Sequence, residues 1–155
     1  MVERTAEALG REIAQEVGLP PGVLNVVTGP GSSAGQAIVE HSGIDKIAFT
    51  GSTLVGKLIN KAATDSLKRV SLELGGKSPV IVLPDADLDT AIKGAAGAIF
   101  FNAGQVCAAG SRLYVHRKLF DRVVEGVGGA AQSIRLGPGL DPATQMGPLV
   151  SREQQ

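Results

Sequence analysis

The sequence contains one cysteine, Cys107, and two histidines among its 155 residues. A single cysteine excludes an internal disulfide framework and is typical of a reducing compartment, so we expect a cytoplasmic protein. His41 and His116 lie far apart in the sequence, and neither has a second ligand at metal-binding spacing. We therefore expect no metal site.

Long apolar runs and an excess of charge of one sign are also absent. No stretch approaches the roughly 20 apolar residues that a membrane-spanning helix needs, and the N-terminal segment has a charged helical pattern rather than that of a signal peptide. The 15 basic and 15 acidic residues balance and are scattered along the chain. This pattern excludes a concentrated basic surface, so we expect no nucleic acid partner and no membrane association.

Glycine, by contrast, is plentiful, with 21 residues, whereas aromatic residues make up 3% of the chain. The glycines follow no fixed period, which excludes collagen-like and low-complexity sequence. They fall between short apolar runs, which is typical of an α/β protein with many tight turns between strands and helices.

Helical and strand patterns alternate along the chain. Apolar residues at helical spacing predict helices over 2–17, 32–40, 53–63, 88–99 and 120–127, the last weakened by glycines at 128 and 129. Short apolar runs predict strands over 23–27, 46–50, 69–74, 80–83 and 113–115. Strands separated by helices imply right-handed crossovers, so we predict an α/β fold with parallel strands.

Two runs of residues surround reactive side chains with glycine and other small residues. Cys107 ends the run 100–107 (FFNAGQVC), and Glu73 opens the run 73–79 (ELGGKSP). Small residues let a substrate approach the backbone closely. A thiolate is a strong nucleophile and a carboxylate can act as its partner base, so the two runs together favour nucleophilic catalysis over a merely buried cysteine.

The neighbouring residues suggest how each group is activated. A thiolate forms at neutral pH only with help, and Cys107 follows a predicted helix and a glycine turn, where the start of another short helix can supply that help. Glu73 is flanked by Leu72 and Leu74, which predicts an apolar surrounding suited to a general base.

A further candidate site lies at 49–56 (FTGSTLVG), a predicted turn from a strand into a helix. Unpaired N–H groups at a helix start, together with a glycine and two hydroxyls, suit a phosphate or pyrophosphate. Gly29, Gly31 and Gly35 follow the preceding strand, one residue off the usual G-x-G-x-x-G spacing. Ordinary turn and packing roles for these glycines remain an alternative.

The sequence resembles the NAD(P)-dependent aldehyde dehydrogenase family along essentially its whole length. Segments that look like family signatures, in family order, are 20–27 (PPGVLNVV), 45–53 (DKIAFTGST), 73–79 (ELGGKSP), 102–107 (NAGQVC) and 140–149 (LDPATQMGPL). The resemblance implies part of a Rossmann-like, parallel-sheet nucleotide-binding domain at 1–73. It implies the first part of an α/β catalytic domain at 74–155.

This resemblance assigns chemical roles to the reactive residues. It implies that Cys107 attacks an aldehyde to give a thiohemiacetal, whose hydride passes to the nicotinamide of NAD or NADP. Water activated by Glu73 would then hydrolyse the resulting thioester to a carboxylic acid. It also implies that the full-length enzyme is a homodimer or homotetramer.

The resemblance also implies a set of cofactor contacts. The cofactor-binding residues carried over by motif are Gly31, Gly35, Gly51, Ser52, Val55, Gly56 and Leu74. Ser52 would contact the pyrophosphate, Val55 would lie near the adenine, and Leu74 beside the nicotinamide. Lys77 and Arg112 match family positions and are interpreted as structural anchors.

The resemblance covers the middle third of the family's chain. It implies that an upstream asparagine of the oxyanion hole, an upstream lysine and a downstream glutamate that binds the nicotinamide ribose are missing. Losing one oxyanion donor costs on the order of a hundred- to a thousand-fold in rate. We therefore expect the 155 residues to be a fragment that is inactive alone and whose exposed strand edges favour aggregation.

Other functions remain open. In a coenzyme-A-acylating semialdehyde dehydrogenase a thiol would take the acyl group, whereas Glu73 favours water. A non-catalytic truncated paralogue is disfavoured because both reactive residues are present. A cysteine hydrolase needs a histidine to activate the thiol, and neither histidine lies in such a setting. Segments 94–101 and 110–116 resemble family members that act on phenylacetaldehyde-like aldehydes, which favours aromatic or medium-chain apolar substrates.

Overall fold

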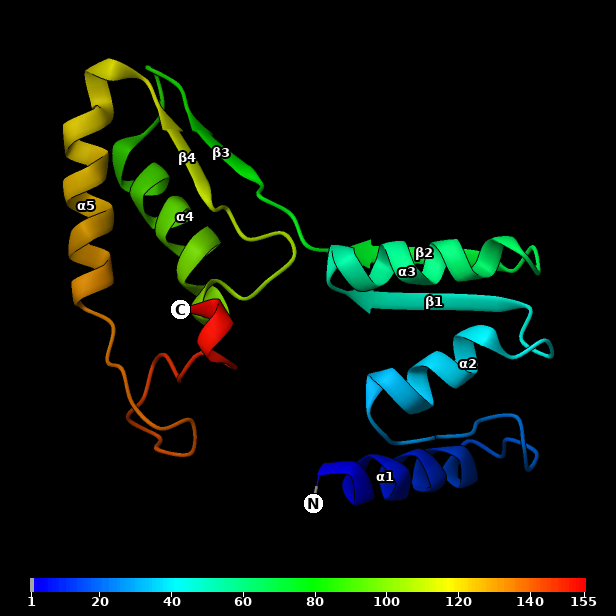
Figure 1. Ribbon diagram of the computed structural model, residues 1–155. Helices are drawn as coiled ribbons and strands as arrows, with labels where there is room; N and C mark the ends of the chain where they lie inside the picture. Colours follow the sequence, from blue (N-terminus) through cyan, green and yellow to red (C-terminus); the bar gives the residue numbers. More distant parts are fainter. Residues whose placement is uncertain (1) are drawn as a thin grey trace. The chain divides into compact units, whose positions relative to one another are not determined.

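The computed structural model describes residues 2–155 and divides the chain into two compact units, Met1–Leu72 and Glu73–Gln155 (Figure 1). Elements up to the boundary are α1 (Val2–Glu16), the π-helical turn η1 (Gly31–Gly35), α2 (Gln36–Glu40), β1 (Lys46–Gly51), α3 (Thr53–Thr64) and β2 (Arg69–Leu74), whose last two residues belong to the second unit. Those beyond it are β3 (Pro79–Val82), α4 (Leu88–Phe100), η2 (Phe101–Gly104), β4 (Arg112–Val115), η3 (Arg117–Leu119), α5 (Phe120–Gln132) and η4 (Arg152–Gln154).

In the first unit, β1 and β2 pair in a two-stranded sheet and α3 connects them. The N–H of Arg69, at the start of β2, donates to the carbonyl of Asp45 just before β1 at 3.0 Å. The two strands therefore begin side by side and run in the same direction, as the sequence pattern predicts. Ile47 of β1 and Ile59 and Ala63 of α3 are buried, so the core of this unit lies between helix and sheet.

Residues 23–27 form no strand in the structure, so this prediction is wrong. A strand needs a neighbour that exchanges backbone hydrogen bonds with it, and no segment of the described chain pairs with 23–27. The chain here lies against α1 instead. The hydroxyl of Thr28 donates to the carboxylate of Glu7 at 3.0 Å, and the Val26 side chain lies directly against Gly10.

Helix α3 ends in a Schellman motif. The N–H of Lys68 donates to the carbonyl of Ala63 at 3.1 Å, and the N–H of Leu67 donates to the carbonyl of Thr64 at 3.3 Å. This motif puts Leu67 in the left-handed region, with φ of 51°. Glycine is favoured there because a Cβ collides with the backbone. The Leu67 side chain is 87% exposed, so it offers little packing in return.

We expect Leu67→Gly to raise the free energy of unfolding by about 1 kcal/mol, because glycine adopts the left-handed conformation without a steric cost. Urea unfolding of the protein measures the change. Leu67→Ala is the matched control, because alanine removes the exposed side chain and keeps the Cβ. Equal unfolding free energies for the two variants would show that the backbone at Leu67 is not strained.

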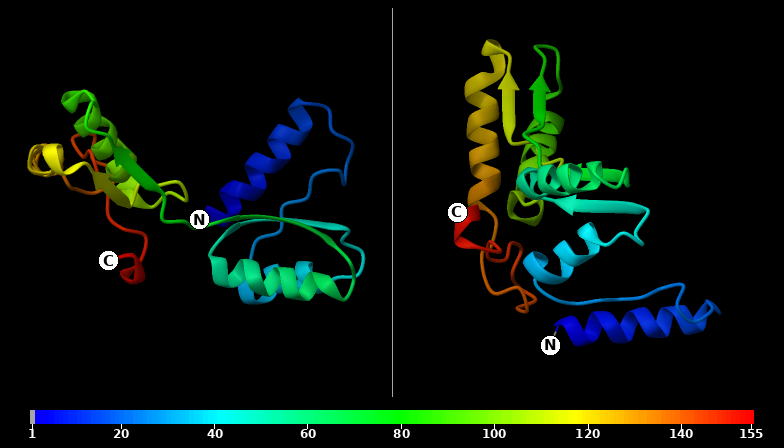
Figure 2. Two further views of the ribbon diagram at one scale, coloured as in Figure 1. Left: turned by 90° about the horizontal axis from the view of Figure 1, so that it is seen from above. Right: turned by 45° about the vertical axis from the view of Figure 1, so that its right-hand side comes forward.

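In the second unit, β3 and β4 form a parallel pair in which Pro79 lies opposite Arg112 and Val82 opposite Val115. Helices α4 and α5 lie side by side next to this sheet (Figures 1 and 2). Val123 of α5 is fully buried, and the helix continues through Gly128 and Gly129, where the sequence predicts weakening. Packing against α4 outweighs the low helix propensity of glycine. None of the described helices has both the length and the hydropathy needed to cross a membrane.

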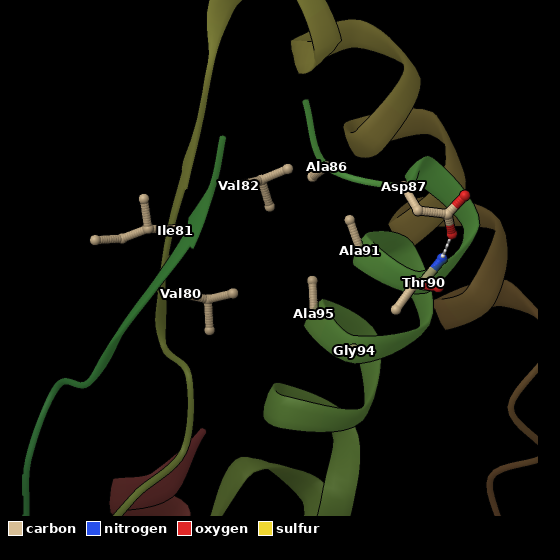
Figure 3. Close-up of a pocket in the computed structure, with 9 residues that line it drawn as sticks. All are labelled: Val80, Ile81, Val82, Ala86, Asp87, Thr90, Ala91, Gly94 and Ala95. Carbon is tan, nitrogen blue, oxygen red and sulfur yellow. Dashed lines mark hydrogen bonds between the residues drawn. The ribbon is translucent and has the colours of Figure 1, made fainter. Parts of the chain in front are cut away.

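Helix α4 begins at Asp87, which caps its first turn. The Asp87 carboxylate accepts the N–H of Thr90 at 2.9 Å (Figure 3). Two hydrogen bonds from Thr90 hold the pKa of Asp87 below its ordinary value of 3.8. The larger effect comes from the Thr90 side chain and the smaller from its backbone N–H. Because the pKa is lowered in the folded state, the stability contributed by the charge is complete above pH 3.8. It is lost as the pH falls through the lower, folded-state value.

We expect Asp87→Asn to lower the melting temperature of the protein at neutral pH, because the amide still caps the helix and lacks the charge that favours the helix start. The difference in melting temperature between Asp87→Asn and the wild type should shrink as the pH falls below 3.8. Thermal unfolding followed by circular dichroism across this range measures it. Asp89→Asn, in the same turn, is the matched control. A difference for Asp87→Asn that does not change with pH would contradict the role of the charge.

Candidate active site

Two parallel strands bring the glutamate and cysteine runs together. The run that begins at Glu73 leads into β3, and the run that holds Cys107 leads into β4. Because Pro79 and Arg112 pair at the starts of these strands, both runs reach the same edge of the sheet. A Cβ placed on Gly76 would lie 3.2 Å from the carbonyl oxygen of Cys107, so the backbones of the two runs touch. This contact lies within the second unit.

Arg112 ties the same two runs together beside this contact. Its Nε donates to the carbonyl of Lys77 at 2.7 Å, and its backbone N–H donates to the carbonyl of Ser78 at 3.3 Å. The guanidinium also donates to the hydroxyl of Tyr114 at 3.3 Å and lies 5.7 Å from the centre of its ring. Arg112 therefore fixes the segment that follows Glu73 against the strand that follows Cys107.

Cys107 is exposed and lies in a turn, so the predicted helix start at this position is wrong. The N–H of Ala109 donates to the carbonyl of Val106 at 3.0 Å and closes the turn around the thiol. The N–H of Gly110 then donates to the carbonyl of Ala98 at 2.9 Å. This bond fixes the chain against α4 and directs it into β4, which leaves no length for another helix.

The surroundings of Glu73 also differ from the prediction. In β2 the burial alternates, with Leu72 and Leu74 half-buried and Glu73 exposed. Successive side chains of a strand point to opposite faces, so residues adjacent in sequence do not surround each other. The two leucines therefore do not form an apolar setting around the carboxylate. Glu73 is open to water, which suits a base whose proton donor is a water molecule.

A left-handed backbone run precedes the cysteine. The φ angles of Asn102, Ala103 and Gly104 are 49°, 55° and 74°. A cleft of about 350 Å³ opens beside this run. It is lined by Phe100, Phe101, Asn102, Ala103, Gln105, Gln145, Met146, Gly147 and Pro148. The Oε1 of Gln105 accepts the backbone N–H of Val150 at 2.9 Å. Sequence reasoning missed this bond, because the two residues lie 45 positions apart and no local pattern signals it.

In the first unit, Ser52 caps the start of α3. Its Oγ accepts the N–H of Val55 at 3.2 Å, and its carbonyl accepts the N–H of Gly56 at 3.0 Å. The N–H groups of Thr53 and Leu54 belong to the first helical turn and have no intrahelical acceptor. The structure therefore gathers Ser52 and two N–H groups at one helix start, an arrangement that can bind an anion.

The other sequence-predicted cofactor residues lie on separate elements. Gly31 and Gly35 begin and end the π-helical turn before α2. A Cβ on either glycine would meet no atom within 4 Å, so no contact in this structure requires glycine there. Leu74 is half-buried at the end of β2. Among the described residues, no group of histidine, cysteine, aspartate and glutamate side chains is arranged to hold a metal ion.

The fold is that of an α/β protein with parallel strands. Its second unit holds a candidate cysteine-dependent active site, where the loop of the exposed Cys107 meets the glutamate run. The family model of the aldehyde dehydrogenase family matches residues 3–155. The chain belongs to the aldehyde dehydrogenase family. The predicted family and α/β class are confirmed.

The chain is similar to several known proteins. It is 57% identical over 142 residues to phenylacetaldehyde dehydrogenase of Pseudomonas fluorescens, covering 92% of this chain and 28% of that protein. Human retinal dehydrogenase 2 is 51% identical over 143 residues, covering 92% of this chain and 28% of that protein. The NAD+ complex of an aldehyde dehydrogenase from Bacillus cereus matches with a TM-score of 0.88 and 51% identity, covering 92% of this chain and 29% of that one. The chain thus spans less than a third of the length of these relatives.

Proposed function

We propose that these residues are part of a longer NAD(P)-dependent dehydrogenase that oxidises an aldehyde to a carboxylic acid. The observation that carries the proposal is the contact between the Glu73 and Cys107 runs at one edge of the β3–β4 sheet, where Gly76 touches the cysteine backbone. A nucleophile and a base are thus supplied by two segments that are far apart in the sequence. Membership of the aldehyde dehydrogenase family supports this chemistry.

In the proposed reaction, the Cys107 thiolate forms a carbon–sulfur bond to the aldehyde carbon and gives a thiohemiacetal. A nicotinamide cofactor, when bound, would accept the hydride that the thiohemiacetal carbon loses, and loss of the hydroxyl proton as well leaves a thioester on Cys107. Glu73 takes a proton from a water molecule, whose oxygen attacks the thioester carbon. The carbon–sulfur bond then breaks, releasing the carboxylic acid and restoring the thiolate. The exposed position of Glu73 supports this role, because water reaches the carboxylate freely.

The start of α3 in the first unit supports a binding site for the pyrophosphate of such a cofactor. Since the Ser52 oxygen already accepts the Val55 N–H, its hydroxyl proton remains to donate to a phosphate oxygen, beside two free N–H groups of α3. We propose that the cofactor is held by Gly31, Gly35, Gly51, Ser52, Val55 and Gly56, with Leu74 beside the nicotinamide. The NAD+ complex of the Bacillus cereus relative supports this choice of cofactor.

The substrate, assembly and location follow from the same proposal. We propose an aromatic or medium-chain apolar aldehyde, supported by the 57% identity to a phenylacetaldehyde dehydrogenase. We also propose that the full-length enzyme is a homodimer or homotetramer in the cytoplasm, and that the 155 residues alone are inactive. The chain covers 28% of each of these two relatives, which supports the inactivity of the 155 residues alone.

The test is formation of reduced cofactor by the full-length native protein. Sequencing outward from both ends of this segment gives the reading frame from which that protein is expressed. We expect NADH or NADPH formation with phenylacetaldehyde and a panel of aliphatic aldehydes, and none with the isolated 155-residue chain. Parallel assays with NAD+ and NADP+ determine the cofactor. Failure of the full-length protein to reduce either cofactor with any aldehyde would contradict the proposed function.

A further inference from the structure

The amide of Gln105 joins the cysteine loop to a segment 45 residues downstream. Its Oε1 accepts the backbone N–H of Val150 at 2.9 Å. Its Nε2 donates to the carbonyl of Asn102 at 3.4 Å. Both ends of the amide are therefore engaged with backbone groups, one inside the loop and one outside it.

Gln105 holds a loop, residues 102–104, whose backbone conformation is unfavourable. Asn102, Ala103 and Gly104 are all left-handed, a conformation in which an alanine Cβ crowds the backbone. Two further bonds close this loop. The N–H of Gln105 donates to the carbonyl of Asn102 at 3.1 Å, and the Asn102 amide donates to the carbonyl of Gln105 at 3.3 Å. A run of this kind persists only when surrounding contacts hold it.

The position of the thiol depends on the two ends of its turn. On the downstream side, Gly110 is fixed to α4 through its bond to Ala98. On the upstream side, the chain between α4 and Cys107 is the left-handed run, and Gln105 is the residue that links it to another segment. Cys107 itself is exposed, so packing around the thiol contributes little.

We propose that Gln105 is a positioning residue that holds the Cys107 thiol in its reactive place through the bond to Val150. This inference rests on the proposed function, in which Cys107 attacks the aldehyde. Because the amide bonds Asn102 inside the loop and Val150 outside it, loss of Gln105 should misplace the nucleophile. Misplacement by about 1 Å can cost roughly a hundred-fold in rate.

Gln105→Met in the full-length enzyme keeps the side-chain size and removes both hydrogen bonds. We expect kcat to fall about ten- to a hundred-fold while KM for the aldehyde changes less than about twofold. Gln132→Met, at an exposed position of α5, is the matched control and should leave both constants unchanged. A kcat for Gln105→Met within twofold of the wild type would overturn the inference.

A second pair of variants removes the same bond from its other end. Val150→Pro deletes the donor N–H, whereas Val150→Ala keeps it, and the Val150 side chain is 83% exposed. We expect a fall in kcat for the proline variant alone. If Gln105→Met fails to fold, the two Val150 variants still test whether the Gln105–Val150 bond positions the thiol. A fall for Gln105→Met together with an unchanged Val150→Pro would also overturn the inference, because the bond to Val150 would then position nothing.

Alkylation of Cys107 by iodoacetamide, followed by mass spectrometry, separates this inference from the proposed function. It reports the placement of the thiol without aldehyde or cofactor. We expect the rate to change several-fold in Gln105→Met and Val150→Pro and to stay unchanged in the two controls. Unchanged rates in all four variants would overturn the positioning role. Absence of aldehyde oxidation in the wild type, with altered alkylation in the variants, would instead refute only the proposed function.

Discussion

Replacement of Cys107 by alanine is expected to lower aldehyde-dependent NADH formation by the full-length enzyme at least about a thousand-fold, the order seen when a covalent nucleophile is removed. The methyl group cannot form the thiohemiacetal, and no other cysteine exists in these 155 residues to replace it. Steady-state rates with saturating aldehyde and cofactor measure the effect. The exposed thiol lies in a turn, so the substitution removes no buried packing and the protein should fold normally.

Cofactor binding is the control for this variant. Titration with NADH, followed by fluorescence, should give the same dissociation constant for the wild type and Cys107→Ala. The proposed cofactor residues lie mainly around α3 and the π-helical turn, in the other unit of the chain. A variant that binds NADH normally and retains a rate within tenfold of the wild type would show that the thiol is not the nucleophile.

Replacement of Glu73 by glutamine is expected to separate the two halves of the reaction. The first turnover still forms the thioester and one equivalent of NADH per active site. Later turnovers should slow about a hundred- to ten-thousand-fold, the range for loss of a general base. The amide cannot take a proton from water, so the acyl group stays on Cys107. Stopped-flow measurement of NADH resolves the burst, and intact-mass spectrometry identifies the acylated protein.

Glu125→Gln, an exposed carboxylate of the same unit on α5, is the matched control and should turn over normally. Added hydroxylamine, a nucleophile that needs no base, should restore turnover in Glu73→Gln. Steady turnover of the variant without a burst would contradict the role of Glu73. Wild-type product release that requires coenzyme A would instead support the acylating alternative.

Most elements of the fold can be predicted from the sequence, because apolar spacing along the chain reports the local period of the backbone. Strands β1 and β2 and helices α3 and α4 lie close to the predicted ranges. Residues 23–27 show the limit of this reasoning. Their apolar run is strand-like, yet a strand exists only where another strand supplies hydrogen bonds, and no described segment does so.

Candidates for the reactive residues could be proposed from the sequence, whereas the geometry of the site could not. The glutamate and cysteine runs identify themselves by their reactive residues and surrounding glycines. Their meeting depends on the parallel register of Pro79 with Arg112, a pairing that local sequence does not specify. The predicted helix start at Cys107 was wrong because the bond from Gly110 to Ala98 directs the chain into β4.

The sequence by itself determined the family, the α/β class, the candidates for the reactive residues and the order of most helices and strands. These properties depend on residue type and on spacing along the chain. The tertiary structure alone decided that Gly76 touches the Cys107 backbone, that Glu73 is open to water and that Gln105 reaches Val150. Such contacts join residues that are distant in sequence, and their geometry is set by packing and strand register rather than by any local pattern.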